Sequence, residues 1–555
     1  MSQFAVPWGS QQADAAEGSH IFLTLALLGL TSHMFFVRYN DVDRIVGKGF
    51  VPYVGSQICL WIWLSIRSSD LLSSATFISL ANLSFFAPLF TSISIYRLFF
   101  HPLRSFPGPS LARLTSWWGV SKIARGANKY ELHHELHKQY GDIVRIAPNF
   151  VSINRIDGLT KVYGAGTKCG KSNTFYNIKD EKSLQTETDL KKHGARRPPW
   201  EKALSIKRSL EYLPQLQVMT NLLARKITED GRQNKNRVLI NHWLTCFSFD
   251  VMGELGYSKS YGCLETGIIH QGIIDMEIAI AMGVVISPLP WLVRLITSII
   301  GVPKHLEGLT NFAASSLAER KASPVDKPDV LQYVFDGKVP LSPAEELEDT
   351  MLLQLGGSDT ANSTLIFAMY HIAASPEIQL ALRKETESAV NGSSELNWEI
   401  LKGLPLLEAV INETLRMHPP VPGGLPRFTP PEGITFGEIY IPGNVSVSSP
   451  TWTIQMDPEN FTDPTTWNPY RFINPPENHN TKAWIPFSVG PFSCVGRVFA
   501  YMEMKNAIAT VVNNFDIKLA QGEDGYKLLN ESKDNTAICC EPVWLDMEPR
   551  ASNRW

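Results

Sequence analysis

An uncharged apolar stretch runs from Leu71 to Tyr96 and limits the folds open to this chain. A helix needs about 20 apolar residues to cross a bilayer, so this stretch is long enough to span one. Two shorter apolar stretches, residues 21–37 and 51–66, precede it. We therefore predict a membrane anchor over residues 19–98 with up to three transmembrane helices, at about 21–37, 51–66 and 71–96.

The charges on either side of the third stretch predict its orientation. Arg97, Arg104 and Arg113 follow it closely, whereas the only charges in residues 1–18 are acidic. Because basic residues stay on the cytosolic side of a membrane, the remainder of the chain faces the cytosol and residues 1–18 form a lumenal tail. Proline restricts its own backbone and that of its predecessor, so the Pro/Gly-rich segment 99–110 is predicted to be a stiff hinge.

Composition narrows the classes of function. Charged residues make up 19% of the 555 residues, below the roughly 25% of a soluble domain, which fits a chain that lies partly in lipid. The formal net charge is −3, so no basic field favours a nucleic-acid partner. Seven cysteines without regular spacing do not suggest a disulfide framework, and a reducing compartment is the simpler interpretation.

One helix is strongly marked after the hinge. Ser342 suits the N-cap and Pro343 the first helical position, and an apolar pattern continues to Ser375, where Pro376 ends it. Thirty-odd residues at 1.5 Å each give a rod of roughly 45–50 Å, enough to cross a domain. The polar, glycine-containing segment 356–360 in its middle weakens helix, so we expect a local bulge there. Short strand-like runs occupy about 420–450 and 515–550.

A glycine-containing loop surrounds Cys494. Its sequence is Phe487-Ser488-Val489-Gly490-Pro491-Phe492-Ser493-Cys494-Val495-Gly496. A thiolate is stabilised by backbone N–H donors and by the positive end of a helix. Gly490 and Gly496 allow tight turns that aim such donors, and the helical pattern that follows places Cys494 at a helix N-terminus. A thiolate held in this way can bind haem iron, with Phe487 shielding the sulfur.

This loop resembles the haem-binding motif F-x-x-G-x-R-x-C-x-G of the cytochrome P450 family. All fixed positions match except Phe492, where the family has a basic residue that contacts a haem propionate. The resemblance covers about Arg97 to the C-terminus and implies a mainly α fold with small β-sheets. The long central helix would lie over a haem b whose iron is bound by Cys494. Residues 111–555 would form the cytosolic haem-binding monooxygenase domain.

The segment Gly356-Gly357-Ser358-Asp359-Thr360-Ala361 resembles the family's A/G-G-x-D/E-T-T/S motif, with Ala361 as a departure. The resemblance implies that Thr360 and Asp359 deliver the protons that O₂ cleavage consumes. The two glycines would leave room for O₂ and substrate.

Two further sets of residues take their roles from the resemblance. Glu413 and Arg416 fit E-x-x-R, and Arg471 lies in a segment similar to P-E-R-F, with Tyr470 in place of Glu. They would form a buried charge network that fixes the cysteine loop, a structural role. His193 and Arg197 lie where the family has W-x-x-x-R, and Arg427 resembles its other propionate-binding arginine; the alternative for each is a solvated surface charge.

The motif sequences are similar to those of fungal microsomal members of the family. This resemblance implies that the chain is located in the endoplasmic reticulum membrane. The implied reaction inserts one oxygen atom from O₂ into a hydrophobic small molecule, such as a terpenoid or polyketide intermediate of secondary metabolism. No flavin or nicotinamide motif is visible, so NADPH would act only indirectly, through an NADPH–cytochrome P450 reductase docked near Cys494. Cytochrome b5 is a second implied partner.

Two other classes of function stay open. A haem-thiolate isomerase or dehydratase would need neither O₂ nor a reductase, and Thr360 and Asp359 would then have no use. A non-enzymatic membrane protein that binds haem, or has lost it, would fit the departures at Phe492, Tyr470 and Ala361. Replacing Thr360 by Ala separates these readings, because only a monooxygenase would then waste electrons as peroxide.

Overall fold

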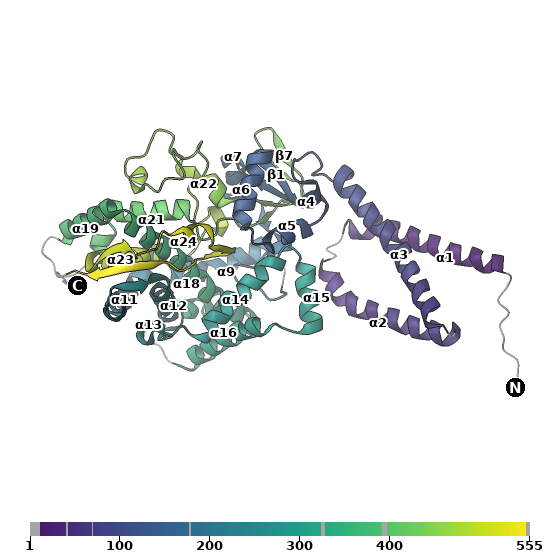
Figure 1. Ribbon diagram of the computed structural model, residues 1–555, viewed down its shortest axis with the longest axis horizontal. Helices are drawn as coiled ribbons and strands as arrows, with labels where there is room; N and C mark the ends of the chain where they lie inside the picture. The colour runs from purple at the N-terminus through teal and green to yellow at the C-terminus, as the bar shows by residue number, and fades with distance from the viewer. Residues whose placement is uncertain are drawn as a thin grey trace. The chain divides into compact units, whose positions relative to one another are not determined.

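The computed structural model describes residues 11–39, 43–68, 70–176, 179–323, 328–390 and 397–550. The described chain falls into two compact units. The first comprises the residues up to Val120 together with Arg145–Asn149 and Ile286–Pro303, and the second comprises the remainder. Figure 1 labels their helices and strands in chain order. Residues 1–10 of the predicted lumenal tail lie outside the described residues, and α1 begins at Gln11, within that tail.

Three long helices dominate the first unit: α1 (Gln11–Ser32), α2 (Asp43–Ser68) and α3 (Leu71–Ile95). With the short π-helices η1 (His33–Val37) and η2 (Tyr96–Phe100), they provide three segments long and apolar enough to cross a membrane. These segments are Ser19–Val37, Ile45–Arg67 and Leu71–Phe100, and they lie in the region predicted to form the anchor. The short helices α4 (Ser110–Leu114) and α15 (Pro290–Ile300) complete the unit, and α5 (Trp117–Ile123) extends from it.

Polar side chains join the three apolar helices. Asn82 of α3 accepts a hydrogen bond from the Tyr53 hydroxyl and donates one to Gln57 Oε1 at 3.1 Å. His33 Nδ1 and Ser92 Oγ lie 2.7 Å apart and form a second link. In an apolar surrounding such hydrogen bonds between helices favour association. The anchor is therefore a packed helical unit.

One buried arginine fixes the segment predicted to be a hinge. Arg145 is fully buried and donates to the carbonyl oxygens of Arg97 at 2.9 Å, Arg113 at 3.4 Å and Pro148 at 2.6 Å. Its backbone N–H donates to Pro107 O at 2.7 Å. Gly108 lies so close to Arg145 O that a Cβ there would approach it to 2.2 Å. The segment that follows the third apolar helix is therefore tied down within its unit.

The second unit is mainly helical. Its helices are α6 (Lys129–Tyr140), α7 (Ile156–Tyr163), α8 (Asn173–Tyr176), α9 (Leu190–Ala203), α10 (Ile206–Glu211), α11 (Leu213–Gln233), α12 (Ile240–Tyr257), α13 (Cys263–Thr266), α14 (Gln271–Ile286), α16 (Lys304–Ala322), α17 (Val330–Phe335), α18 (Pro343–Ala374), α19 (Pro376–Val390), α20 (Trp398–Leu401), α21 (Pro405–Met417), α22 (Thr451–Gln455), α23 (Arg497–Asn514) and α24 (Tyr526–Asn530). Short 3₁₀ turns are η3 (Pro469–Phe472), η4 (Thr481–Ala483) and η5 (Gly490–Phe492).

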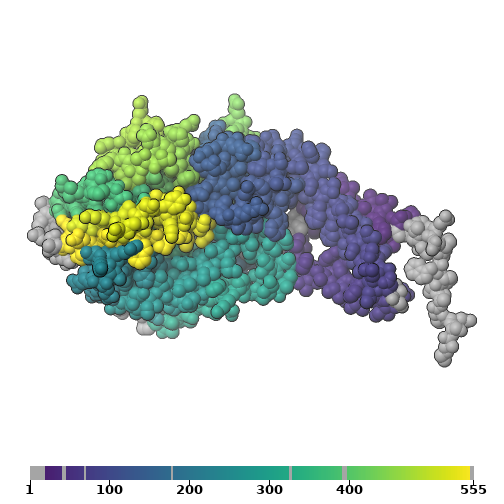
Figure 2. Space-filling model, in the orientation of Figure 1, coloured from purple at the N-terminus to yellow at the C-terminus, as the bar shows by residue number. Residues whose placement is uncertain are grey.

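In the described part of the chain the strands form four small sheets. The largest has the order β1-β2-β8-β5-β3, and the others are β10-β11, β4-β12-β9 and β6-β7. Their strands are β1 (Ile143–Ala147), β2 (Phe150–Ile153), β3 (Gly170–Lys171), β4 (Arg237–Leu239), β5 (Arg427–Phe428), β6 (Ile434–Phe436), β7 (Ile439–Ile441), β8 (Ser446–Ser448), β9 (Phe515–Leu519), β10 (Lys533–Asn535), β11 (Ala537–Cys539) and β12 (Trp544–Pro549). Strands β9 to β12, yellow in Figure 2, reach the surface of this unit.

The predicted long helix is α18, and its start has the predicted cause. The Ser342 hydroxyl accepts from Glu345 N, and the Glu345 carboxylate accepts from Ser342 N at 2.9 Å, which together form a capping box. α18 packs against α12, α16, α21 and α23. Together with α19, α18 is also long and apolar enough to resemble a membrane span. Its side chains such as Leu365 and Ile372, however, are buried in the hydrophobic core of the second unit. The predicted mainly α fold with small sheets is confirmed.

Candidate active site

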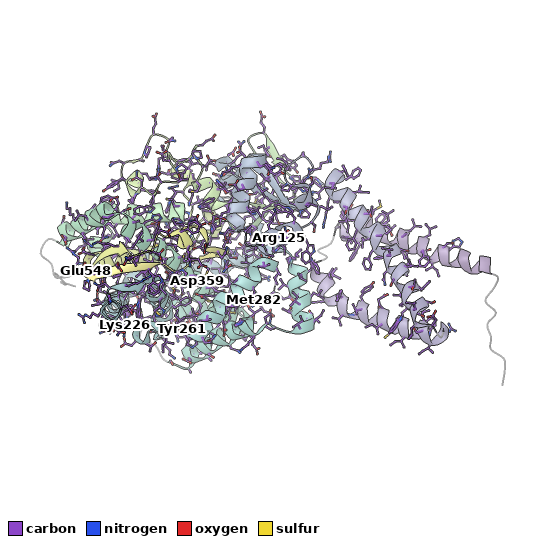
Figure 3. The ribbon with its side chains drawn as sticks, viewed as in Figure 1. Arg125, Lys226, Tyr261, Met282, Asp359 and Glu548 are labelled. Carbon is purple, nitrogen blue, oxygen red and sulfur yellow. The ribbon has the colours of Figure 1, made fainter. Side chains whose placement is uncertain are left out.

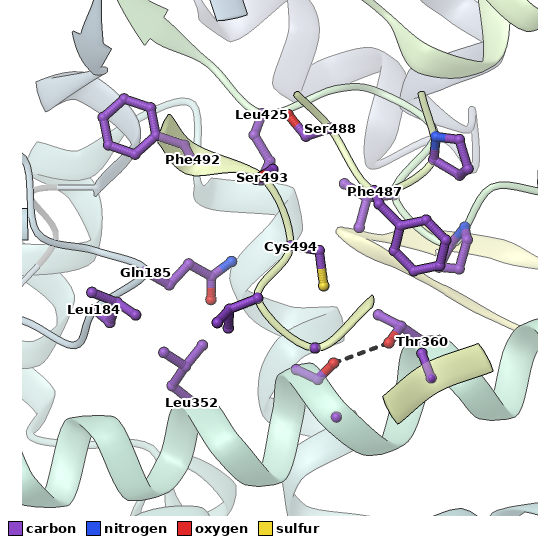
Figure 4. Close-up of a pocket in the computed structure, with 18 of the residues that line it drawn as sticks. Leu184, Gln185, Leu352, Thr360, Leu425, Phe487, Ser488, Phe492, Ser493 and Cys494 are labelled. Atoms are coloured by element: carbon purple, nitrogen blue, oxygen red, sulfur yellow. Dashed lines mark hydrogen bonds between the residues drawn. The ribbon is translucent and has the colours of Figure 1, made fainter. Parts of the chain in front are cut away.

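A cavity of about 320 Å³ lies inside the second unit, between α18 and the cysteine loop. Its walls come from the middle of α18, the start of α23, the loop around Cys494 and the strands β3 and β5. Figure 4 shows Cys494 Sγ pointing into this space, on the side where α18 carries Thr360. Most of the remaining lining is apolar, including Leu352, Leu425 and Phe499.

Backbone donors surround the Cys494 sulfur. The chain passes through η5 and returns so that Cys494 N donates to Phe487 O at 2.9 Å. α23 begins at Arg497 with Gly496 as its N-cap, so the backbone N–H groups of both residues lie near Sγ and favour its negative form. Burial raises the thiol pKa of Cys494, whereas these donors and the charges of Arg197 and Arg497 lower it. Burial is the largest of these effects, so the net pKa of the thiol is raised, and the backbone donors and the two arginines offset only part of that shift.

The two loop glycines have different reasons to be there. Gly490 has φ +70°, and a Cβ at this position would lie 2.1 Å from Tyr163 O. Only glycine fits such an approach. Gly496 has φ −84°, a conformation that other residues adopt, and a Cβ there would lie 3.8 Å from Cys494 Sγ. The backbone freedom predicted for Gly496 is therefore not used, and a Cβ there would make only an ordinary van der Waals contact with the sulfur.

Basic side chains gather at the end of the cavity where Phe492 lies. His193 is buried, and its ring centroid is 4.7 Å from that of Phe492. Arg427 is also buried, with its Cζ 4.8 Å from the Phe492 centroid. Arg197 pairs with Glu201 at 2.6 Å and donates to Ser493 O at 2.9 Å. All three line the cavity, so the alternative of solvated surface charges does not describe them.

Burial, together with the charges of Lys171, Arg197 and Arg427, lowers the pKa of His193 to about 3. The imidazole is therefore neutral and offers one ring N–H as a donor. Because His193 is neutral, it does not add to the repulsion among the other basic side chains at this end of the cavity.

Lys171 belongs to the same group, although the motifs did not identify it. It lies on β3 and lines the cavity, with Nζ 5.0 Å from the Phe492 ring centroid. Its sequence neighbourhood, Gly164 to Ser172, resembles a phosphate loop that fails the required spacing. The only sequence feature that could have pointed to Lys171 is its place in a short strand. The local sequence does not tell which residue of another strand pairs with it.

The bulge expected at residues 356–360 does not occur. α18 is a continuous helix where it passes the cavity. The Thr360 hydroxyl faces the cavity and donates to Gly356 O at 2.9 Å (Figure 4). A Cβ on Gly356 would meet only its own helix, at 3.7 Å from Leu352, so this residue leaves open space. A Cβ on Gly357 would lie 2.3 Å from Met252 of α12, so its small size also serves helix packing.

Asp359 is not among the residues that line the cavity, although its neighbour Thr360 is. Asp359 belongs to α18, and its side chain is partly buried (Figure 3). Burial raises the pKa of Asp359 to about 7, with a smaller contribution from the Glu277 carboxylate. The group can therefore take up and release a proton near neutral pH, as a proton relay requires.

Glu413, Arg416 and Arg471 come together away from the cavity. Glu413 accepts from Arg416 Nε at 2.7 Å and from Arg471 Nε at 2.9 Å, and all three side chains are almost fully buried. Arg416 also donates to Gln455 O and Arg471 to Thr462 O. The Gln455 amide oxygen in turn accepts from Ile485 N, two residues before Phe487. The network thus reaches the start of the cysteine loop through backbone contacts.

The residues of this cavity fit a haem with a thiolate ligand. A thiol supported by backbone donors stands at one side, and four basic side chains stand at one end. Arg427 Nε is buried and has no hydrogen-bond partner in the described part of the chain. No group of three or more His, Cys, Asp or Glu residues arranged for a metal ion occurs in the described part of the chain.

Known proteins give an independent comparison. The family model for cytochrome P450 matches residues 107–538. Tryprostatin B 6-hydroxylase of Aspergillus fumigatus is 30% identical over 535 residues, covering 93% of this chain and 94% of the relative. Cytochrome P450 monooxygenase notG′ of Aspergillus versicolor is 33% identical and covers 83% and 86%, respectively. Cytochrome P450 monooxygenase lcsK of Purpureocillium lilacinum is 30% identical over 91% and 94%.

Proposed function

Because this chain belongs to the cytochrome P450 family of haem-thiolate monooxygenases, we propose that Cys494 is its iron ligand and that it oxidises a hydrophobic small molecule in secondary metabolism. One observation carries the assignment of the site. One cavity contains a cysteine sulfur beside the N-terminus of α23 and, at one end, a group of basic side chains. Haem bound in this cavity supplies the activation of O₂.

The residues around the cavity divide between binding and support. His193, Arg197 and Arg427 bind the haem carboxylates, because they are the basic groups of the motifs that reach the cavity. Phe487 covers the sulfur and packs against Tyr501, with ring centroids 5.6 Å apart. Glu413, Arg416 and Arg471 hold the backbone that enters the cysteine loop and take no part in the chemistry.

Thr360 and Asp359 handle protons. O₂ cleavage consumes two of them, and a hydroxyl beside the cavity can hold the first donor in place. Thr360 now donates to Gly356 O, and a hydroxyl proton can rotate to another acceptor without moving the helix. Asp359, one residue away and with a pKa near neutrality, resupplies the proton from inside the protein.

The anchor and the partners follow from the apolar helices and the family. Residues 19–98 hold the enzyme in the endoplasmic reticulum membrane, with residues 111–555 in the cytosol, because basic residues follow the third span. Electrons come from an NADPH–cytochrome P450 reductase that docks near Cys494, and cytochrome b5 can serve as a second donor. A membrane-bound enzyme with an apolar cavity meets lipid-soluble substrates, and the relative named as a tryprostatin B hydroxylase supports hydroxylation as the reaction.

The reaction is tested with O₂ enriched in heavy oxygen. Membranes that contain the enzyme and a reductase are given NADPH and a panel of fungal aromatic alkaloids, terpenoids and polyketides. We expect one product whose mass rises by one heavy oxygen atom, together with consumption of NADPH. A product that gains oxygen from water, or turnover without O₂ and NADPH, would support the isomerase or dehydratase class instead.

A further inference from the structure

Phe492 replaces the basic residue of the haem-binding motif, and its ring is where basic side chains meet. Arg427 Cζ lies 4.8 Å and Lys171 Nζ 5.0 Å from the ring centroid. The His193 ring packs on it at 4.7 Å. The face of an aromatic ring attracts cations, so Phe492 can hold Lys171 and Arg427 beside each other by cation–π contacts.

Lys171 and Arg427 are direct neighbours across two strands. β3 pairs with β5 antiparallel, and the register places Lys171 opposite Arg427. Like charges directly opposite each other destabilise a strand pair. Both side chains are also buried, at 6% and 1% exposure, so water screens the repulsion poorly. Two adjacent buried cations are a costly arrangement for a purely structural purpose.

The described chain offers these cations little compensation. Lys171 Nζ donates to Leu184 O at 2.8 Å, and Arg427 Nη1 donates to the carbonyls of Leu425 and Pro426 at 3.2 Å. No carboxylate lies within ion-pair distance of either one in the part of the chain that the structure describes. Burial and the charge of Arg427 lower the pKa of Lys171 to about 6, and Glu187 offsets this only partly, so full protonation of the amine near pH 7 requires an anion beside it. Both side chains line the cavity, so an anion there would relieve the repulsion.

We propose that Lys171 binds a haem carboxylate and supplies the cation that the cysteine loop lacks at position 492. Phe492 holds Lys171 beside Arg427, so the positive charge reaches the haem from β3 instead of from the loop. This inference rests on the proposed function, since it requires haem in the cavity. It explains how the chain departs from the haem-binding motif without losing the charge that the motif supplies.

The test measures how fast haem leaves the holoenzyme. Detergent-solubilised protein is mixed with excess apomyoglobin, and the transfer of haem is followed in the Soret band. Lys171→Met keeps the buried stem and removes the charge, so we expect haem loss to be about 10-fold faster, the effect of one charge-assisted hydrogen bond. Lys168→Met is the matched control, because Lys168 is exposed and pairs with Glu432 on the surface.

A second variant distinguishes haem binding from general damage. Adding Phe492→Arg to Lys171→Met returns a cation to the motif position and should slow haem loss again, whereas Lys171→Arg alone should resemble the wild type. Haem loss from Lys171→Met at the rate of Lys168→Met would overturn the inference, as would failure of both charge-restoring variants. In those cases the wild type still shows its thiolate Soret band with CO. Absence of that band from the wild type would instead defeat the proposed function itself.

Discussion

Removal of the Glu413 carboxylate should destabilise the second unit severely. Glu413 accepts hydrogen bonds from Arg416 Nε at 2.7 Å, Arg416 Nη2 at 2.9 Å, Arg471 Nε at 2.9 Å and Asn468 N at 2.9 Å. Glu413→Ala leaves two arginines buried without their counterion. Breaking one buried ion pair costs about 3–5 kcal/mol, and here two cations share one carboxylate, so we expect about 4 kcal/mol or more. A typical domain has about 5–15 kcal/mol in total.

The assay is urea unfolding of the solubilised holoenzyme, followed by the Soret band of its CO complex. Glu399→Ala is the control, because Glu399 is 72% exposed and pairs with Lys402 on the surface. Exposed pairs contribute about 0–1 kcal/mol, so the control should unfold with the wild type. A Glu413→Ala protein that also lies within about 1 kcal/mol of the wild type would refute the reasoning. The role proposed for the network, which is to support the cysteine loop, would then be refuted as well.

Three further expectations follow from the same structure. Thr360→Ala should keep NADPH consumption but divert most electrons to hydrogen peroxide, and unchanged product yield per NADPH would contradict the proton role. Burial raises the Asp359 pKa to about 7, so the folded chain holds a proton that the unfolded chain loses near pH 4. Wild-type stability should therefore fall from pH 4 to 7 relative to Asp359→Asn, and parallel thermal midpoints across this range would count against it. Arg145→Met removes the side-chain donors to the carbonyls of Arg97 and Arg113, so trypsin should cleave at Arg104 faster than in the wild type.

Local signals in the sequence were sufficient for much of the fold. The start of α18 depends on Ser342, Pro343 and Glu345, which are neighbours in the chain, so a capping pattern predicts it. The apolar helices follow from composition alone, since a bilayer sets their length. The Cys494 loop is a compact motif, and the backbone groups that favour the negative form of its sulfur belong to Gly496 and Arg497, which follow within three residues.

Contacts between distant segments were out of reach. Lys171 and Arg427 are strand neighbours, but nothing local in either segment encodes that pairing, so Lys171 was missed. The bulge expected in α18 does not occur: the helix is continuous through residues 356–360, where its packing against α12 overrides the low helix propensity of the two glycines. From the sequence alone, Phe492 indicates only that the basic residue of the motif is lost. The folded chain shows that Lys171 and Arg427 lie beside its ring.

The most direct test of the central claim is the CO difference spectrum of dithionite-reduced membranes. The account predicts the strongly red-shifted Soret band of a thiolate ligand in the wild type and its loss in Cys494→Ala. A histidine-type band, or no band in well-expressed wild-type protein, would contradict it and favour a chain that binds haem differently or not at all.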